Sequence, residues 1–186
     1  SIHILVNNAG FGILGRIDST PFSELERMMQ TNYFGAVNTT LAVLPIMKSQ
    51  RCGAIVNVSS IAGIMGVAGM GGYGATKAAL IGFTESLRDE VLRDGIRVSM
   101  ICPGVTEGGE FFQSADRAAI PAASRLLRPL SPEDVARAIR RAIEGGSYRI
   151  ILPAEAAIFM RLKEFFPRAA HFLMRVTSAL LERKKP

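Results

Sequence analysis

The chain has 186 residues, of which 48% are hydrophobic, and a formal net charge of +6. This length suits one globular domain with a sizeable core plus an appendage. The positive charge lies at the end of the chain: residues 147–186 carry eight Lys or Arg against three Asp or Glu, whereas residues 1–146 carry 14 against 13. A nearly neutral body without a basic stripe interleaved with aromatics argues against nucleic-acid binding.

Cysteines, histidines and apolar runs exclude further classes of protein. Cys52 and Cys102 lack metal-ligand spacing, which favours a reduced, cytoplasmic setting. His3 and His171 are isolated in the sequence, so we predict no metal site. No stretch reaches the ~18 uncharged apolar residues of a membrane span. We therefore expect a cytoplasmic protein.

Apolar runs and helical patterns alternate along the chain. The apolar runs predict four strands, of which the first two are expected to be buried: Ile2–Asn8, Ala54–Val58, Arg97–Cys102 and Tyr148–Leu152. Helical spacing predicts helices between them: Pro21–Gln50 in two pieces, Tyr73–Arg93 and Pro132–Glu144. Strands that alternate with helices of this length indicate an α/β fold with a doubly wound parallel sheet.

Two of these helices have recognisable starts. Thr20 is expected to cap the first helix, with Pro21 at the first helical position. Ser131 precedes Pro132 and two acids in the first turn, which favour the helix dipole.

Polar or glycine-rich segments follow three of the strands: Asn7–Gly15, Ser59–Gly72 and Pro103–Gly109. Ligands of open parallel sheets bind beyond the carboxyl ends of the strands, so we expect the site there. Gly10–Gly15 also matches the G-x-G-x-x-G pattern of dinucleotide-binding loops. No continuous helix start follows it and no acid lies about twenty positions on, so we interpret it as a loop at the rim of the site.

Tyr73 and Lys77 stand four residues apart at the head of a predicted helix, so they share one face. A neighbouring ammonium would lower the pKa of the Tyr73 phenol from about 10 and make it a usable general acid or base. Such a pair also occurs by chance on surface helices. Ser60, thirteen residues before Tyr73 at a strand end, adds a hydroxyl that can bind a substrate oxygen as charge develops on it.

Five motifs in this order resemble those of the classical short-chain dehydrogenase/reductase family: Asn7-Asn8-Ala9-Gly10, Asn32, Ile55–Ser60, Tyr73–Lys77 and Pro103-Gly104. The resemblance covers about residues 2–150. It implies a Rossmann-like fold and an oxidoreductase that transfers a hydride between NAD or NADP and a ketone or secondary alcohol. It also implies a homodimer or homotetramer.

The resemblance implies catalytic roles for four residues. Tyr73 would transfer the proton, Ser60 would hold the substrate oxygen, and Lys77 would lower the Tyr73 pKa while bonding the nicotinamide ribose. Asn32 would order a water that relays protons to Lys77. Ser60 is chosen over Ser59 because it meets the family's thirteen-residue gap, which leaves Ser59 to packing.

The other matching residues would contact the cofactor. They are Asn8, Ala9 and Gly10 on its adenosine side, and Pro103, Gly104, Val105 and Thr106 near the nicotinamide carboxamide. Gly108 and Gly109 depart from the family pattern, and Thr106 is taken as the carboxamide-binding threonine.

The family's first strand and its glycine-rich phosphate loop would precede Ser1, as would the residue that selects NAD or NADP. We therefore expect an N-terminally truncated member, which leaves two interpretations open. The first is an oxidoreductase. The second is a non-catalytic relative that acts through dimer or membrane-surface contacts.

Residues 1–152 are predicted to form the catalytic part and residues 153–186 a basic helical extension. Apolar residues recur at helical spacing over 156–183 with basic residues between them, which predicts two amphipathic helices broken at Pro167. The extension would either pack over the substrate cleft or a second subunit, or adsorb to an anionic membrane surface. An apolar substrate is suggested by four side chains, although such residues more often belong to a core: Met65, Met70, Phe111 and Phe112.

Overall fold

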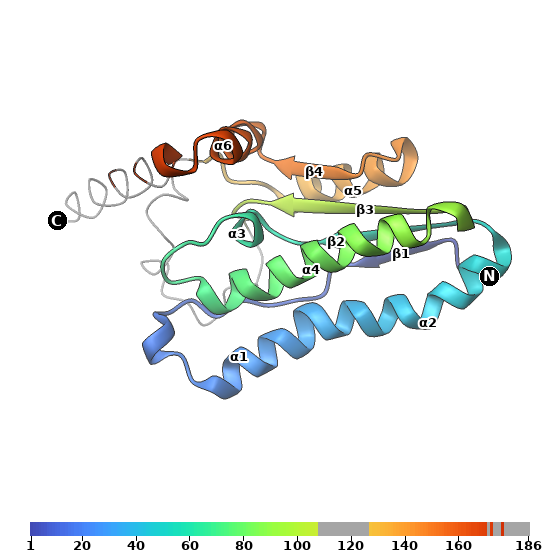
Figure 1. The fold of residues 1–186 in the computed structure, drawn as a ribbon, viewed down its shortest axis with the longest axis horizontal. Coiled ribbons are helices and arrows are strands. Elements are labelled where there is room, and N and C mark those ends of the chain that lie inside the picture. Colours follow the sequence, from blue (N-terminus) through green and yellow to red (C-terminus); the bar gives the residue numbers. More distant parts are fainter. Residues whose placement is uncertain (108–126, 171, 173–175, 177–186) are drawn as a thin grey trace.

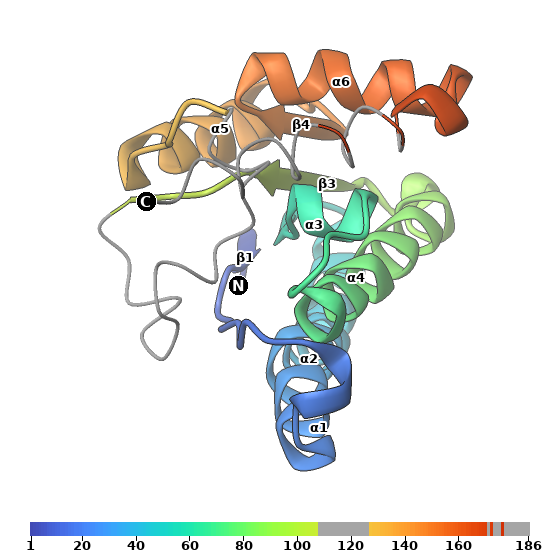
Figure 2. The same ribbon diagram turned by 90° about the vertical axis from the view of Figure 1, so that its left-hand side faces the viewer.

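The computed structural model describes residues 1–107, 127–170, 172 and 176. Four strands in this part form one parallel sheet whose order follows the sequence: β1 (Ile4–Asn7), β2 (Gly53–Val58), β3 (Ile96–Pro103) and β4 (Arg149–Leu152). Helices cover both faces of the sheet, as Figures 1 and 2 show. The predicted α/β fold with a doubly wound, Rossmann-like parallel sheet is thereby confirmed.

The helices lie between the strands close to their predicted positions. One long helical run consists of α1 (Phe22–Met29), a π-helical turn η2 (Gln30–Phe34) and α2 (Gly35–Gln50). The later helices are α3 (Ile61–Ile64), α4 (Gly71–Glu90), α5 (Pro132–Gly145) and α6 (Ala154–Phe165), with 3-10 turns η1 (Ile17–Ser19) and η3 (Leu92–Asp94). The short helix α3 and the π-helical turn were not predicted.

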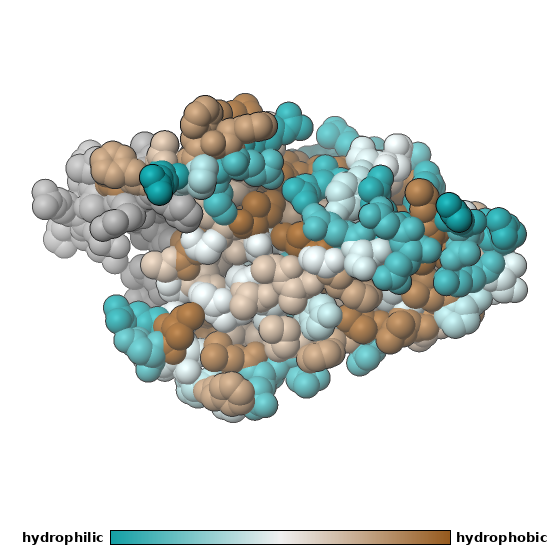
Figure 3. All heavy atoms as spheres, in the orientation of Figure 1, coloured by the Kyte–Doolittle hydropathy of each residue, from teal (hydrophilic) through white to brown (hydrophobic). Residues whose placement is uncertain are grey.

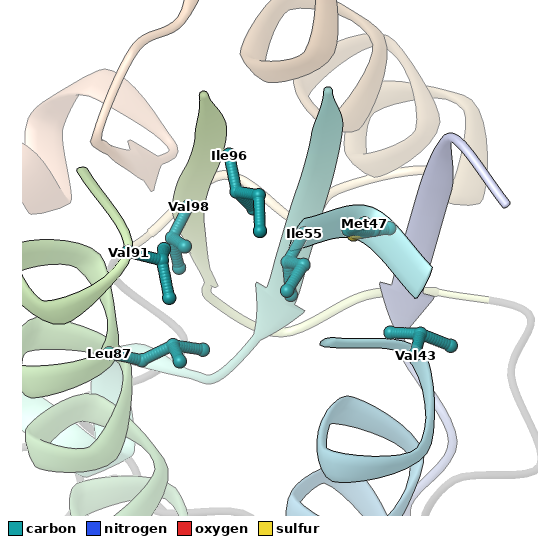
Figure 4. Close-up of a cluster of buried hydrophobic side chains, with 7 residues drawn as sticks. All are labelled: Val43, Met47, Ile55, Leu87, Val91, Ile96 and Val98. Atoms are coloured by element: carbon teal, nitrogen blue, oxygen red, sulfur yellow. The ribbon is translucent and has the colours of Figure 1, made fainter. Parts of the chain in front are cut away.

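The core lies on both faces of the two central strands. Ile55 of β2 packs against α2 and α4 in a cluster that Figure 4 shows: Val43, Met47, Ile55, Leu87, Val91, Ile96 and Val98. The next residue, Val56, faces the other way and packs with Ile101 against Ala138 and Ala142 of α5. Successive side chains of a strand point to opposite faces, so a strand covered on both sides is apolar throughout.

The predicted cap of the first helix is wrong. The Thr20 hydroxyl donates a hydrogen bond to the Arg16 carbonyl oxygen at 2.8 Å, so it serves the preceding turn. Pro21 stands at the cap position without a side-chain cap, and α1 begins at Phe22. By contrast, Ser131 and Asp134 form a reciprocal capping box at the start of α5.

The predicted extension starts as a helix directly after β4. Helix α6 ends at Phe165, and helical structure resumes over residues 167–170. The interruption predicted at Pro167 is therefore present, with Pro167 at the first position of the new helical segment. Most of the second predicted helix lies outside the described residues.

Candidate active site

Ser59 and Ser60 follow β2 and serve different purposes. The Ser59 hydroxyl donates to the backbone oxygen of Lys77 at 2.9 Å, which is a packing contact. The Ser60 hydroxyl accepts from the Ala62 amide at 3.1 Å and donates to the Pro103 carbonyl at 3.4 Å. Ser60 thus caps α3 and lies where β2 and β3 end, at the predicted edge of the sheet.

Tyr73 and Lys77 lie in the first turns of α4 and are 5% and 2% exposed. The Lys77 Nζ lies 5.9 Å from the centre of the Tyr73 ring and donates to the Val58 carbonyl at 2.9 Å. A hydrogen bond joins Ser60 and Tyr73. The structure therefore brings the three side chains together from the end of β2 and the head of α4.

Two glycines allow α3 to approach α4 closely enough for this arrangement. A Cβ atom at Gly63 would lie 2.7 Å from the carbonyl carbon of Lys77, and one at Gly74 would lie 2.9 Å from the carbonyl oxygen of Ala62. Both distances are shorter than a side chain tolerates. The sequence predicts a glycine-rich segment over Ser59–Gly72 and a helix from Tyr73, but it does not reveal that these glycines serve packing.

Asn32 lies in the π-helical turn η2 and is 1% exposed. Its amide nitrogen donates to the Phe11 carbonyl at 2.8 Å and to the Thr76 hydroxyl at 3.0 Å, and its amide oxygen accepts from the Phe11 amide at 2.9 Å. Asn32 therefore ties the loop after β1 to α4. Single π-helical turns are rare and are frequent at functional sites.

Gly10 meets Asn32 and Lys77 at this edge. A Cβ atom at Gly10 would lie 2.9 Å from the Asn32 amide oxygen and 3.4 Å from the Lys77 Nζ. Asn8 and Ala9 precede it and are exposed. The segment Gly10–Gly15 is a loop followed by the 3-10 turn η1, so it does not open an α-helix as a pyrophosphate-binding fingerprint would.

The segment after β3 borders the same edge. The Gly104 amide donates to the Leu152 carbonyl at 2.8 Å, and a Cβ there would lie 3.5 Å from the Ile61 side chain, directly after Ser60. Val105 and Thr106 run beside the fully buried Leu130, with Thr106 in a parallel bridge to it. The predicted glycines and aromatics that follow, Gly108, Gly109, Phe111 and Phe112, lie outside the described residues.

Burial shifts the pKa of both titratable groups at the centre of the site. It raises the pKa of Tyr73 to about 12, against the opposing effect of the hydrogen bond with Ser60. It also lowers the pKa of Lys77 to about 8. The predicted lowering of the Tyr73 pKa is therefore not observed in this structure, because desolvation outweighs the favourable contacts. The protonated phenol is the stable form.

A buried network of amides and hydroxyls links the strands that lead to the site with two helices, and it was not predicted. The Asn7 amide nitrogen donates to the Asn57 amide oxygen at 2.8 Å and to the Thr40 hydroxyl at 3.1 Å. The Asn57 amide nitrogen donates in turn to the Thr84 hydroxyl at 2.9 Å. These bonds join β1 and β2 to α2 and α4. The available signal was a polar residue inside each of two apolar strand patterns.

Two further features are absent from the described part of the chain. It contains no group of three or more His, Cys, Asp or Glu side chains placed to hold a metal ion. None of its helices has both the length and the apolar character needed to cross a membrane.

Known proteins share this sequence pattern and architecture. A family model described as short chain dehydrogenase matches residues 1–119. The ketoacyl reductase HetN of Nostoc is 34% identical over 152 residues, which is 81% of this chain and 51% of that protein. Retinol dehydrogenase 8 of Bos taurus is 36% identical, over 76% of this chain and 52% of that protein.

Solved structures give the same picture. A short-chain dehydrogenase from Streptomyces avermitilis is 33% identical with a TM-score of 0.75, and the match covers 95% of this chain and 70% of that one. The closed form of a serine dehydrogenase complexed with NADP+ is also 33% identical, with a TM-score of 0.74 over 81% of this chain and 64% of that one.

The sheet and the residues gathered at its carboxyl edge define a Rossmann-like α/β protein with a Ser–Tyr–Lys constellation. The chain belongs to the short-chain dehydrogenase/reductase family. It spans about half the length of the curated relatives it matches.

Proposed function

We propose that the protein is an oxidoreductase that transfers a hydride between NADP or NAD and an apolar ketone or secondary alcohol. The observation that carries this proposal is the convergence of Ser60, Tyr73 and Lys77 at the carboxyl edge of a parallel sheet. A bound nicotinamide would supply or accept the hydride. The residues of this chain would manage the proton and the charge on the substrate oxygen.

In the direction of reduction, the Tyr73 hydroxyl donates its proton to the carbonyl oxygen of the substrate. Burial keeps this phenol protonated, so a donor is ready when charge develops. The Ser60 hydroxyl donates a hydrogen bond to the same oxygen and stabilises its negative charge. After transfer, the neighbouring Lys77 ammonium stabilises the tyrosinate that remains.

Lys77 also fits a cofactor ribose. An ammonium has three N–H donors, and among the described residues only the Val58 carbonyl accepts from it. Two donors therefore remain for ribose hydroxyls. We propose that Asn32 orders a water that relays protons to Lys77, and that its contacts with Phe11 and Thr76 also hold the loop after β1 against α4.

The cofactor would lie along the edge where the three strand-end segments meet. We propose that Asn8, Ala9 and Gly10 line its adenosine side and that Pro103, Gly104, Val105 and Thr106 approach its carboxamide. Two structural relatives were solved with this kind of cofactor, a serine dehydrogenase with NADP+ and ElxO with NADP. These names support a nicotinamide dinucleotide and leave the choice between NAD and NADP open.

An apolar substrate is supported by the surroundings of Tyr73. Its ring packs in a cluster of apolar side chains with Met28 and Ala62, joined by the partly buried Phe11, Ile13, Leu25 and Met70. Several relatives carry names of enzymes for hydrocarbon-rich substrates, including retinol dehydrogenase 8 and a 3-ketodihydrosphingosine reductase of Bacteroides thetaiotaomicron. A hydrocarbon chain beside the carbonyl would suit such walls.

The division into a catalytic part, 1–152, and a helical extension, 153–186, belongs to this proposal, as do a cytoplasmic location and a homodimer or homotetramer. Helix α2 offers exposed apolar side chains for such an assembly, with Leu41 59% and Ile46 38% exposed. Sedimentation analysis of the purified chain measures the number of subunits.

The test of the proposed function is Tyr73→Phe, which removes the hydroxyl and keeps the ring. Cofactor oxidation would be followed by absorbance with a long-chain ketone, in the chain and in any longer encoded protein that contains it. We expect turnover to fall at least about a thousandfold, near the upper range for a lost general acid, while cofactor binding measured by fluorescence persists. Tyr33→Phe, a half-buried tyrosine in η2, is the matched control and should keep parental turnover. Undiminished turnover in Tyr73→Phe would contradict the assignment.

A further inference from the structure

Helix α6 carries apolar side chains on two sides. Ala156 and Met160 are buried against the body of the protein. Ile158, Leu162 and Phe165 recur at i, i+4 and i+7, share the opposite side, and are 62%, 52% and 76% exposed. Phe166, which directly follows the helix and is 64% exposed, extends this side. We call these four residues the outer face of α6. Figure 3 shows apolar side chains gathered along the upper edge of the molecule, over α6.

The body of the protein holds α6 in this orientation. The Lys163 Nζ donates to the Ile64 carbonyl at the end of α3, at 2.8 Å, and Figure 2 shows α6 above α3. The next residue, Glu164, pairs with Arg149, which also pairs with Glu85 of α4. These contacts lie on the inner side of α6, so they keep the outer face turned away from the core. Water contact with four large apolar side chains is unfavourable, so the outer face needs a cover from outside the described body.

The charges beside the outer face are basic. Arg161 and Arg168 are exposed, and neither forms an ion pair with any residue that the structure describes. The two acids of α6 are engaged within the protein: Glu155 accepts from the Arg128 amide at 3.2 Å, and Glu164 faces Arg149. The sequence around them has eight basic against three acidic residues over 147–186. The uncompensated charge next to the apolar side chains is therefore positive.

We propose that the outer face of α6 lies on the surface of an anionic lipid bilayer, with the helix axis parallel to the membrane plane. The apolar side chains would enter the boundary between headgroups and acyl chains, and Arg161 and Arg168 would contact anionic headgroups. Twelve residues make a helix of about 18 Å, which is too short to span the bilayer. A second copy of the chain would cover the same face but would add its own arginines to these. Charge complementarity therefore favours the lipid surface.

The proposal concerns α6 alone and does not depend on the proposed catalytic activity. Its probe is flotation of the purified chain with vesicles of phosphatidylcholine, with and without phosphatidylserine. We expect binding to the mixed vesicles and a loss of at least about tenfold in affinity when Leu162 and Phe165 are both changed to Ser. Changing Arg161 and Arg168 to Gln should cost about fivefold per residue, on the anionic vesicles only.

Leu92→Ser is the matched control, because Leu92 is 67% exposed on η3, outside α6, and this variant should bind like the parent. All variants change exposed side chains, and circular dichroism would show that they keep the parental helix content. Equal flotation of the parent and the Leu162/Phe165 variant would overturn the proposal. So would a parent that ignores both kinds of vesicle while the same variant turns a dimer into a monomer, since the outer face would then be a subunit contact.

Discussion

Lys77 combines deep burial with a positive charge. It is 2% exposed, and within the described part of the chain its ammonium has one hydrogen-bond acceptor, the Val58 carbonyl. Burial accordingly lowers its pKa from 10.5 to about 8. The folded chain therefore holds a lysine whose charge costs stability in the absence of a bound partner.

This shift predicts how stability depends on pH. Below pH 8 Lys77 is charged in the folded and unfolded states, so the full burial penalty applies; above 10.5 it is neutral in both, and the penalty is gone. The free energy of unfolding should therefore rise by on the order of 2 kcal/mol between pH 8 and pH 10. The raised pKa of Tyr73 acts in the opposite direction only above its ordinary value of 10, where the unfolded tyrosine ionises first.

Urea denaturation across this pH range measures the effect, and Lys77→Met should abolish the rise. Lys48→Met serves as the control, because the Lys48 side chain is 50% exposed and should leave the rise unchanged. A parent chain whose stability stays flat from pH 8 to pH 10 would contradict the predicted burial effect.

The sequence predicts which residues meet at the site, but not the direction of their pKa shifts or their hydrogen-bond partners. The spacing of Ser60, Tyr73 and Lys77 suffices to place them at one site, because strand ends and helix starts converge on one edge of a parallel sheet. The direction of the Tyr73 shift depends on how much water reaches the phenol, which spacing does not encode. Asn32 similarly lies within a predicted helix, and only its contacts with Phe11 and Thr76 show that it holds the loop after β1 in place.

The contact between α3 and α4 sets the position of the site. Gly63 lies against the backbone of Lys77 and Ala78, where a Cβ atom would be 2.7 to 2.9 Å from the nearest atoms. These atoms belong to the helix backbone and cannot move aside as a flexible side chain would. A methyl group at this position should push the two helices apart.

We therefore expect Gly63→Ala to lower the free energy of unfolding by about 1–3 kcal/mol. Gly82→Ala, in the same helix α4 but with open space around it, should instead raise stability by up to about 1 kcal/mol. Chemical denaturation of both variants makes the comparison. A Gly63→Ala variant as stable as the parent would show that α3 does not pack as described.

Element positions follow well from the sequence where a single signal dominates. Apolar runs between turn residues suffice to predict the four strands, and Ser131 followed by Pro132 and two acids suffices to predict the start of α5. Thr20 does not cap the helix because its hydroxyl donates a hydrogen bond to the Arg16 carbonyl instead. Helix α3 was not predicted because it begins a glycine-rich segment. The Ser60 cap and the contact with α4 stabilise it.

At the scale of the whole molecule, polar contacts between distant parts of the sequence attach β4 and α6 to the helices α4 and α3. Lys163 and Ile64 are separated by 99 positions, and Arg149 and Glu85 by 64. Such partners cannot be paired from one sequence, because Lys163, Arg149 and Glu85 are ordinary charged residues and the Ile64 partner is a backbone carbonyl. The sequence alone therefore leaves open whether the extension packs over the substrate cleft, against a second subunit or on a membrane surface.

The Lys163 contact predicts how firmly α6 is attached. Lys163→Met keeps the length of the side chain but loses the hydrogen bond to the Ile64 carbonyl, which should speed amide exchange in α6 about fivefold to tenfold. Amides of the β2 and β3 core should be unaffected. Lys163→Arg retains a donor and should restore much of the protection. Hydrogen–deuterium exchange with peptide resolution measures all three, and unchanged exchange in Lys163→Met would refute the anchoring role.

The Asn7–Asn57 pair has a consequence for how the strands find their alignment. The two residues are directly opposite each other in the register of β1 and β2, and the hydrogen bond between their amides spans the two strands. If β1 slipped by one residue, its side chains would turn to the other face of the sheet, and the hydrogen bonds from Asn7 to Asn57 and Thr40 would be lost. Apolar strands alone would tolerate several offsets. This pair of amides makes one alignment of the sheet distinct from its neighbours.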